Sequence, residues 1–96
     1  MNREQIIETL KSDLSLLQNN YGADAIALFG SYARNEQQPG SDIDILVRME
    51  NADFSKLMAL QRFLESRLNS KIDLVRMGSH LTPRFFNIVG KDIIYV

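Results

Sequence analysis

The sequence predicts a small α+β domain in which a mixed β-sheet carries helices packed on one face. Two observations support this fold class. Short apolar stretches typical of buried strands alternate along the chain with longer segments whose apolar residues recur at helical spacing. The chain also has 96 residues, 45% hydrophobic and 24% charged, a composition typical of one soluble globular domain. We therefore expect a single domain over residues 1–96.

The first quarter of the chain predicts a long helix followed by a buried strand. Apolar residues recur at helical spacing from Ile6 to Leu17, and Asn2 provides a capping-box-like start. We therefore expect a helix from Arg3 to about Asn19. The apolar run Ala25–Phe29 then predicts a strand.

A short helix and a turn separate this strand from the next one. The segment from Ser31 to about Glu36 is interpreted as the helix, and the turn-forming residues Gln-Gln-Pro-Gly at 37–40 follow it. An alternation of polar and apolar residues then predicts a second strand over Asp42–Arg48, with its apolar side chains directed into the core.

A second long helix and a third strand come next. Asn51 or Asp53 is suited to cap this helix, because short polar side chains accept hydrogen bonds from free N–H groups at a helix start. The apolar face of the helix comprises Phe54, Leu57, Leu60, Leu64 and Leu68. The third strand is expected over Lys71–Val75.

The last part of the chain predicts one more helix and a closing strand. Thr82-Pro83 marks the helix start, because proline suits the first helical position. Gly90 marks its end, since glycine is common just after helices. A strand over Asp92–Val96 closes the expected fold.

The charge balance and the absence of cysteine argue against several function classes. Eleven basic and twelve acidic residues give a net charge of −1 without a Lys/Arg-rich stripe, so duplex nucleic-acid binding is not expected. Without cysteine, neither disulfides nor thiolate zinc sites can form. No apolar run approaches the ~20 residues that span a bilayer, and no signal peptide is evident at the start. We expect a cytoplasmic protein without membrane association.

The most informative stretch is Phe29–Val47, in which Gly30-Ser31 is followed, after ten residues, by Asp42-x-Asp44. Glycine lets the main chain approach a ligand closely, and the N–H groups at a helix start attract phosphate. The Ser31 hydroxyl adds one more donor. The plainer interpretation is a turn with Ser31 as helix N-cap, and both can hold together.

The aspartates point to divalent metal chemistry. Strand geometry places Asp42 and Asp44 on one face, ~6–7 Å apart along the chain. A carboxylate pair at this separation can bracket two ions ~3.5–4 Å apart, the arrangement used for in-line displacement at phosphorus. Mg²⁺ is the natural ion, because it takes oxygen ligands and keeps water and phosphate in its shell. Asp73 joins the pair if the second and third strands are neighbours. The alternative interpretation is that Asp42 caps a turn and that Asp44 and Asp73 are solvated charges on their strands.

Arg34 lies one turn into the short helix, and two roles remain open for it. It can reach the phosphates as a bidentate donor. It can equally form a structural ion pair that orients Asp42 or Asp44.

These motifs resemble those of the DNA polymerase beta-type nucleotidyltransferase superfamily, and in particular its small MNT (minimal nucleotidyltransferase) proteins. The likeness extends over nearly the whole chain and comprises Gly30-Ser31-Tyr32-Ala33-Arg34, Ser41-Asp42-Ile43-Asp44, Lys71-Ile72-Asp73-Leu74-Val75 and Ile93-Ile94-Tyr95-Val96. Asp73 stands where the family's third carboxylate belongs. Many relatives have Gly where this chain has Asn35, but Asn tolerates positive φ, so we expect the turn to be kept.

The resemblance implies a magnesium-dependent nucleotidyltransferase that uses ATP. Asp42, Asp44 and Asp73 would be its catalytic and metal-binding residues, and Asp73 would help deprotonate the acceptor hydroxyl. Gly30 and Ser31 would bind the β- and γ-phosphates of the nucleotide. Arg34 is the further candidate for nucleotide binding.

The resemblance also implies a partner. MNT proteins are typically encoded beside a HEPN-domain ribonuclease toxin, act as its antitoxin, and include members that transfer AMP from ATP to a tyrosine of that toxin. Larger nucleotidyltransferases carry a further domain over base and acceptor, so we expect another protein to supply the acceptor in a hetero-oligomer. Two alternatives remain: an antitoxin that acts by contact without catalysis, and a nucleotidyltransferase for a small-molecule hydroxyl.

Overall fold

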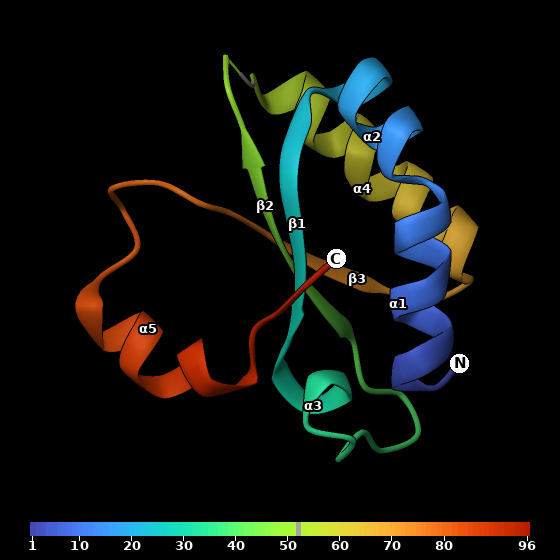
Figure 1. Cartoon of the computed structure of the whole chain (residues 1–96), viewed down its shortest axis with the longest axis vertical. Helices are drawn as coiled ribbons and strands as arrows, with labels where there is room; N and C mark the ends of the chain where they lie inside the picture. Colours follow the sequence, from blue (N-terminus) through green and yellow to red (C-terminus); the bar gives the residue numbers. More distant parts are fainter. Residues whose placement is uncertain (52) are drawn as a thin grey trace.

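The computed structural model of the chain describes residues 1–51 and 53–96. Its elements are, in chain order, α1 (Arg3–Ser12), α2 (Leu14–Tyr21), β1 (Ala23–Phe29), α3 (Gly30–Ala33), β2 (Ile43–Met49), α4 (Phe54–Leu68), β3 (Ile72–Arg76), α5 (Pro83–Val89), the 3₁₀ turn η1 (Gly90–Asp92) and β4 (Ile94–Tyr95) (Figure 1). The strands form one mixed sheet in the order β3-β2-β1-β4. β2 and β3 run parallel, whereas β1 is antiparallel to β2 and to β4. The predicted α+β fold with a mixed sheet is therefore confirmed.

Helices α1, α2 and α4 cover one face of the sheet, whereas α5 lies on the opposite side, so the prediction that the helices pack on one face holds for all of the longer helices but not for α5 (Figure 1). The main core lies under α1, α2 and α4, and Ile43, Ile45 and Val47 of β2 contribute fully buried side chains to it. Leu46 points to the other face, where Phe85 and Val89 of α5 pack in a second, smaller cluster. This division follows from strand geometry, because successive side chains point to opposite faces.

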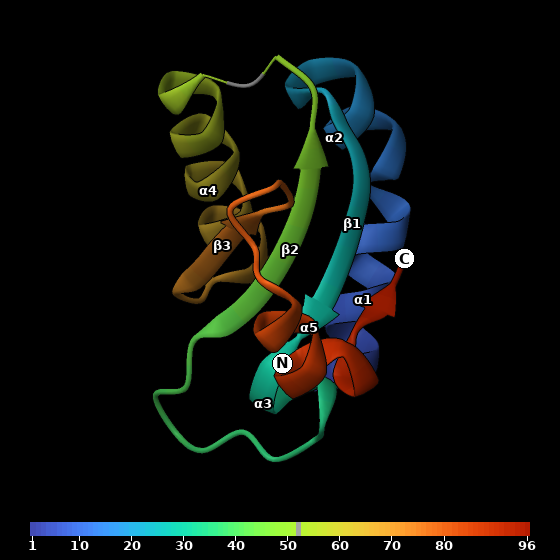
Figure 2. The same cartoon turned by 90° about the vertical axis from the view of Figure 1, so that its left-hand side faces the viewer.

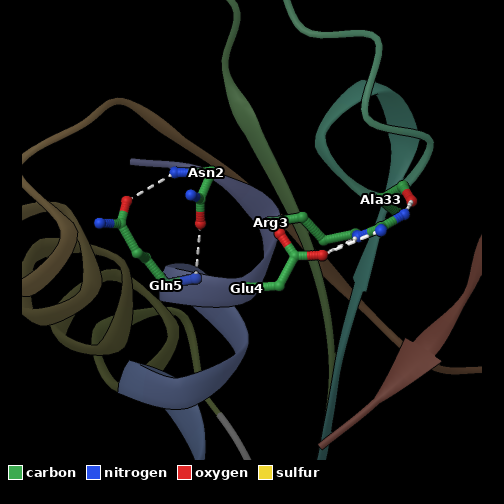
Figure 3. Close-up of polar contacts among 5 residues, drawn as sticks. All are labelled: Asn2, Arg3, Glu4, Gln5 and Ala33. Carbon is green, nitrogen blue, oxygen red and sulfur yellow. Dashed lines mark hydrogen bonds and ion pairs between the residues drawn. The ribbon is translucent and has the colours of Figure 1, made fainter.

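The helix starts follow the sequence expectations. Asn2 caps α1, because its side chain accepts from the Gln5 N–H at 2.8 Å while the Gln5 side chain accepts from the Asn2 N–H at 2.8 Å (Figure 3). Asp53, rather than Asn51, caps α4 and accepts from the Lys56 N–H at 2.8 Å. At the start of α5, the Thr82 side chain accepts from the Phe85 N–H at 3.3 Å, and Gly90 ends that helix.

Several predicted boundaries were wrong. The helix predicted from Arg3 to Asn19 is broken at Asp13, which leaves the helical conformation (φ −99°, ψ 3°). The Asp13 carboxylate accepts from Arg67 Nε of α4 at 2.8 Å, a contact between elements that helical periodicity cannot reveal. The final strand, predicted over five residues, is limited to Ile94–Tyr95, because Gly90–Asp92 forms a 3₁₀ turn before it. Within the described residues, no helix is long and apolar enough to cross a membrane.

Candidate active site

The site begins where β1 passes into α3 at Gly30. This residue is buried and has φ +74°, a conformation that side chains with a Cβ rarely adopt. A Cβ at Gly30 would lie 2.8 Å from Asp44 Cγ and would collide with the carboxylate oxygen Oδ2. The glycine predicted from sequence is therefore required here for two reasons, its backbone conformation and the space that Asp44 occupies.

The chain between α3 and β2 makes two turns before it reaches Asp42 and Asp44. Asn35 has φ +61°, so the turn in which it stands for a more usual glycine is kept, as expected. The second turn is closed by the Ser41 hydroxyl, which accepts from the Gln38 N–H at 2.9 Å. Immediately after Asp42, the Ile43 N–H donates to the Lys71 carbonyl at 3.0 Å and aligns β2 with the start of β3.

The register of β2 and β3 brings two of the predicted carboxylates side by side. Asp44 is the Cα partner of Asp73 in the parallel pairing, so the predicted adjacency of these strands is confirmed. Asp44 lies between the buried Ile43 and Ile45, and Asp73 follows the buried Ile72, so both aspartates face away from the main core, toward the side of the sheet that carries α5. Asp42 precedes β2 and is exposed, Asp73 is exposed, and Asp44 is half-buried.

The electrostatics of the site are concentrated on Asp44. The pKa of this carboxyl is raised to about 6, first by burial and then by the neighbouring Asp73, through its charge and a hydrogen bond between the two side chains. The charge of Asp42 acts in the same direction, whereas the Arg34 guanidinium lowers the pKa of Asp44. The three predicted aspartates thus interact, and Asp44 lies at the centre of their mutual repulsion.

These carboxylates fit a divalent cation in chemistry, although the described residues contain no group of three or more His, Cys, Asp or Glu that could hold a metal ion by themselves. Mg²⁺ does not need such an enclosure, since it is usually bound by one or two carboxylates plus substrate phosphates and water. Asp44 and Asp73 supply adjacent hard oxygen ligands. Besides burial, repulsion from Asp73 and Asp42 raises the pKa of Asp44, and this repulsion is of the kind that a bound cation relieves.

Ser31 and Arg34 both belong to the short α3 region but differ in their surroundings. Ser31 is the second residue of α3 and is not its N-cap, a position that Phe29 occupies without a side-chain hydrogen bond. The plain N-cap interpretation of Ser31 is therefore wrong. Arg34 Nη1 lies 3.4 Å from Asp92 Oδ2, and Arg34 Nε lies 3.7 Å from Glu36 Oε2.

The structure thus gives Arg34 ion-pair partners that sequence reasoning missed. One of the two roles left open for Arg34 was a structural ion pair with Asp42 or Asp44, but its ion pairs in the structure are with Asp92 and Glu36. Asp92 is 58 residues away in sequence and belongs to η1, so no local spacing pointed to it. Arg34 still acts on the site, because its charge lowers the pKa of Asp44.

Helix α3 is also held from the side of α1. Arg3 Nη1 donates to the Ala33 carbonyl at 3.3 Å, while its Nη2 pairs with Glu4 at 2.9 Å (Figure 3). This contact ties the last residue of α3 to the first turn of α1. The Gly-Ser turn is therefore supported by an element of the main helical layer.

The sequence and the fold are similar to those of known proteins. The family model described as polymerase beta, nucleotidyltransferase matches residues 4–95. MJ0128 of Methanocaldococcus jannaschii, which carries the provisional name of protein adenylyltransferase, is 41% identical over 93 residues, 96% of this chain and 95% of that protein. A solved structure provisionally described as a minimal nucleotidyltransferase has a TM-score of 0.80 at 32% identity and covers 98% of this chain and 95% of its own. A chain in the complex of tri-AMPylated Shewanella oneidensis HEPN toxin with MNT antitoxin has a TM-score of 0.58 at 27% identity, covering 98% of this chain and 67% of its own.

Proposed function

This chain belongs to the polymerase beta nucleotidyltransferase family, and we propose that it transfers AMP from ATP to a tyrosine hydroxyl of a HEPN-type ribonuclease toxin, as that toxin's antitoxin. The observation that carries this proposal is the contact of the Gly-Ser turn with the carboxylates. Gly30 leaves room for Asp44, and Asp44 lies beside Asp73. The turn that we propose to bind phosphate and the carboxylates that we propose to bind metal therefore meet at one place.

Each residue then has a defined task. The N–H groups at Gly30 and Ser31, with the Ser31 hydroxyl, bind the β- and γ-phosphates. Arg34, at the end of the same short helix, adds a charged donor for the triphosphate. The acceptor hydroxyl attacks the α-phosphorus, the bond from that phosphorus to the β-phosphate oxygen breaks, and pyrophosphate leaves. The exposed Asp73 accepts the hydroxyl proton.

Mg²⁺ would be held by Asp44 and Asp73, with Asp42 beside them, and when bound it supplies charge neutralisation for the phosphates. Asp44 is held against Gly30 and is partly withdrawn from water, which preserves its position before the nucleotide arrives. This preorganisation is the contribution of the protein to charge stabilisation.

The partner is proposed from the similar complex of a tri-AMPylated HEPN toxin with its MNT antitoxin. The carboxylates lie on the sheet face away from α1, α2 and α4, so a macromolecular acceptor can approach them without disturbing the main core. We place the reaction in the cytoplasm, in a hetero-oligomer formed by this domain of residues 1–96 with the toxin.

The test uses the purified chain, the HEPN protein encoded beside it, ATP and Mg²⁺. Intact-mass spectrometry of the HEPN protein should show added AMP only when ATP and Mg²⁺ are both present, and fragmentation should place it on a tyrosine. Asp44→Asn should abolish the addition. Asp24→Asn is the matched control, because Asp24 is an aspartate of the same sheet, paired with Arg48 at 4.0 Å.

Each outcome decides the proposal. An unmodified HEPN protein in a stable complex with the wild-type chain would favour an antitoxin that acts by contact alone. AMP on a small-molecule hydroxyl, with none on the HEPN protein, would favour the small-molecule enzyme. Full activity of Asp44→Asn would show that the catalytic carboxylates lie elsewhere.

A further inference from the structure

The guanidinium of Arg34 connects two parts of the chain that meet beside the proposed nucleotide site. Arg34 follows α3 directly, and Asp92 ends η1 in the C-terminal segment. Figure 2 shows α5, which leads into that segment, in front of the end of β1 that continues into α3. The Nη1–Oδ2 distance of 3.4 Å bridges the two.

The backbone around Asp92 is well fixed. The following residue, Ile93, packs in the cluster of Ala27, Phe29 and Leu46 on the sheet. Further along, the Val96 N–H donates to the Ile26 carbonyl at 3.0 Å. The carboxylate that faces Arg34 is therefore anchored to the sheet rather than to a free loop.

The second partner of Arg34 is much less constrained. Glu36 follows α3 by sequence, lies 3.7 Å from Arg34 Nε, and has a side chain 68% exposed. The Asp92 side chain is only 24% exposed. Because exposed ion pairs are weak and screened by solvent, the pair with Asp92 is the one that can restrict the guanidinium.

We propose that Asp92 is a positioning residue for the nucleotide. It holds the Arg34 guanidinium near Asp44, where that group contacts the triphosphate. The inference rests on the proposed function, because it takes Arg34 as a ligand of the nucleotide phosphates. Asp92 itself need not touch the nucleotide.

Two opposite effects of Asp92 have to be compared. Its charge repels an incoming triphosphate, which disfavours binding, but this interaction between exposed charges is screened by water and salt. Against this, arginine has a long side chain whose conformational freedom is lost when it binds phosphate. Holding it beforehand reduces that loss at binding. We expect the second effect to dominate, because the Asp92 carboxylate contacts Arg34 directly, whereas its repulsion of the triphosphate is screened.

The experiment measures Mg·ATP binding and transfer kinetics for Asp92→Asn, Asp92→Glu and the matched control Glu36→Gln. Asp92→Asn should weaken Mg·ATP binding and raise KM for ATP roughly three- to fivefold, as expected for one partly exposed charge pair, while kcat changes less than about twofold. Asp92→Glu keeps the charge and should restore most of the affinity. Glu36→Gln should bind ATP like the wild type.

Titration calorimetry of Mg·ATP needs no acceptor protein, so it separates this inference from the proposed function. If the wild type binds Mg·ATP but modifies no HEPN protein, the transfer proposal fails and the comparison of Asp92 variants still stands. Wild-type affinity in Asp92→Asn, or tighter binding, would overturn the positioning role. Equal losses in Asp92→Asn and Glu36→Gln would also overturn it, as would a wild type that binds no ATP. Thermal melts of each variant show whether a loss of binding merely reflects unfolding.

Discussion

The raised pKa of Asp44 makes a prediction that can be tested without any partner protein. A carboxyl whose pKa is raised from 3.8 to about 6 on folding holds its proton more tightly in the folded chain than in the unfolded chain. Its contribution to stability is therefore fully present below the unfolded pKa and is lost as pH rises through the folded pKa. In the absence of divalent metal, ionised Asp44 destabilises the fold near neutral pH.

The size of this effect follows from the shift. A difference of about two pKa units corresponds to about 3 kcal/mol at ~1.4 kcal/mol per unit. Asp44 is only half-buried, so screening by solvent reduces this figure to about 1–2 kcal/mol. Asp44→Asn removes the charge with little change in shape. At about pH 7.5 in EDTA the variant should be more stable than the wild type by that amount, a rise in Tm of roughly 4–8 °C per kcal/mol.

Magnesium should largely offset this difference. A ligating carboxylate must be deprotonated, so Mg²⁺ competes with the proton and should stabilise the wild type above about pH 6. At roughly ten times its Kd, the ion adds about 1.4 kcal/mol to the wild type and nothing comparable to Asp44→Asn.

Urea denaturation at about pH 5 and about pH 7.5, with EDTA or with Mg²⁺, measures both effects, and Asp24→Asn serves as control. The reasoning would be refuted if Asp44→Asn left the pH dependence in EDTA unchanged, or if Mg²⁺ stabilised both proteins equally.

Other substitutions test the turn and the core. Gly30→Ala meets both the positive φ and the Asp44 carboxylate, so ATP-dependent transfer should fall more than about tenfold and Tm should drop, as measured by mass spectrometry and melting. Ser31→Ala loses one hydrogen bond to a charged oxygen and should slow transfer roughly ten- to a hundredfold; ATP titrations like those of the wild type would show that the triphosphate is held elsewhere. Leu64→Ala opens a cavity under α4 and should cost about 2–5 kcal/mol in urea denaturation, whereas Phe54→Ala, 77% exposed in the wild type, should cost less than about 0.5 kcal/mol.

Predictions from the sequence were most successful where they depended only on the alternation of side chains along a strand. Alternation along β2 predicted that Ile43 and Ile45 enter the core while Asp44 faces away, and the structure has this arrangement. The adjacency of Asp44 and Asp73 followed from the same rule once their strands were assumed to be neighbours. These predictions depended on side-chain direction within a strand and needed no knowledge of distant contacts.

Predictions failed where helix bounds, burial or ion pairs depended on contacts between elements that are distant in sequence, or on where an element ends relative to the core. Helical periodicity continues through Asp13, but this residue leaves the helix where it accepts from Arg67 of another element. Phe54 fits the apolar spacing of α4, yet it occupies the first position of that helix, beyond the end of the core. Asp92 showed no pattern at all, because its relation to Arg34 arises only when η1 is placed beside α3.

One face of the sheet carries the main core, and the other carries the proposed catalytic residues. The face under α1, α2 and α4 buries the main core, so its residues are fixed by packing. The other face bears a small cluster beneath α5 and leaves its aspartates close to water. Burial and the repulsion from Asp73 and Asp42 raise the pKa of Asp44, and such a cost can be tolerated only where packing elsewhere secures the fold. The same repulsion favours a bound cation, so the feature that weakens the free chain is the one that prepares it for a metal-bound nucleotide.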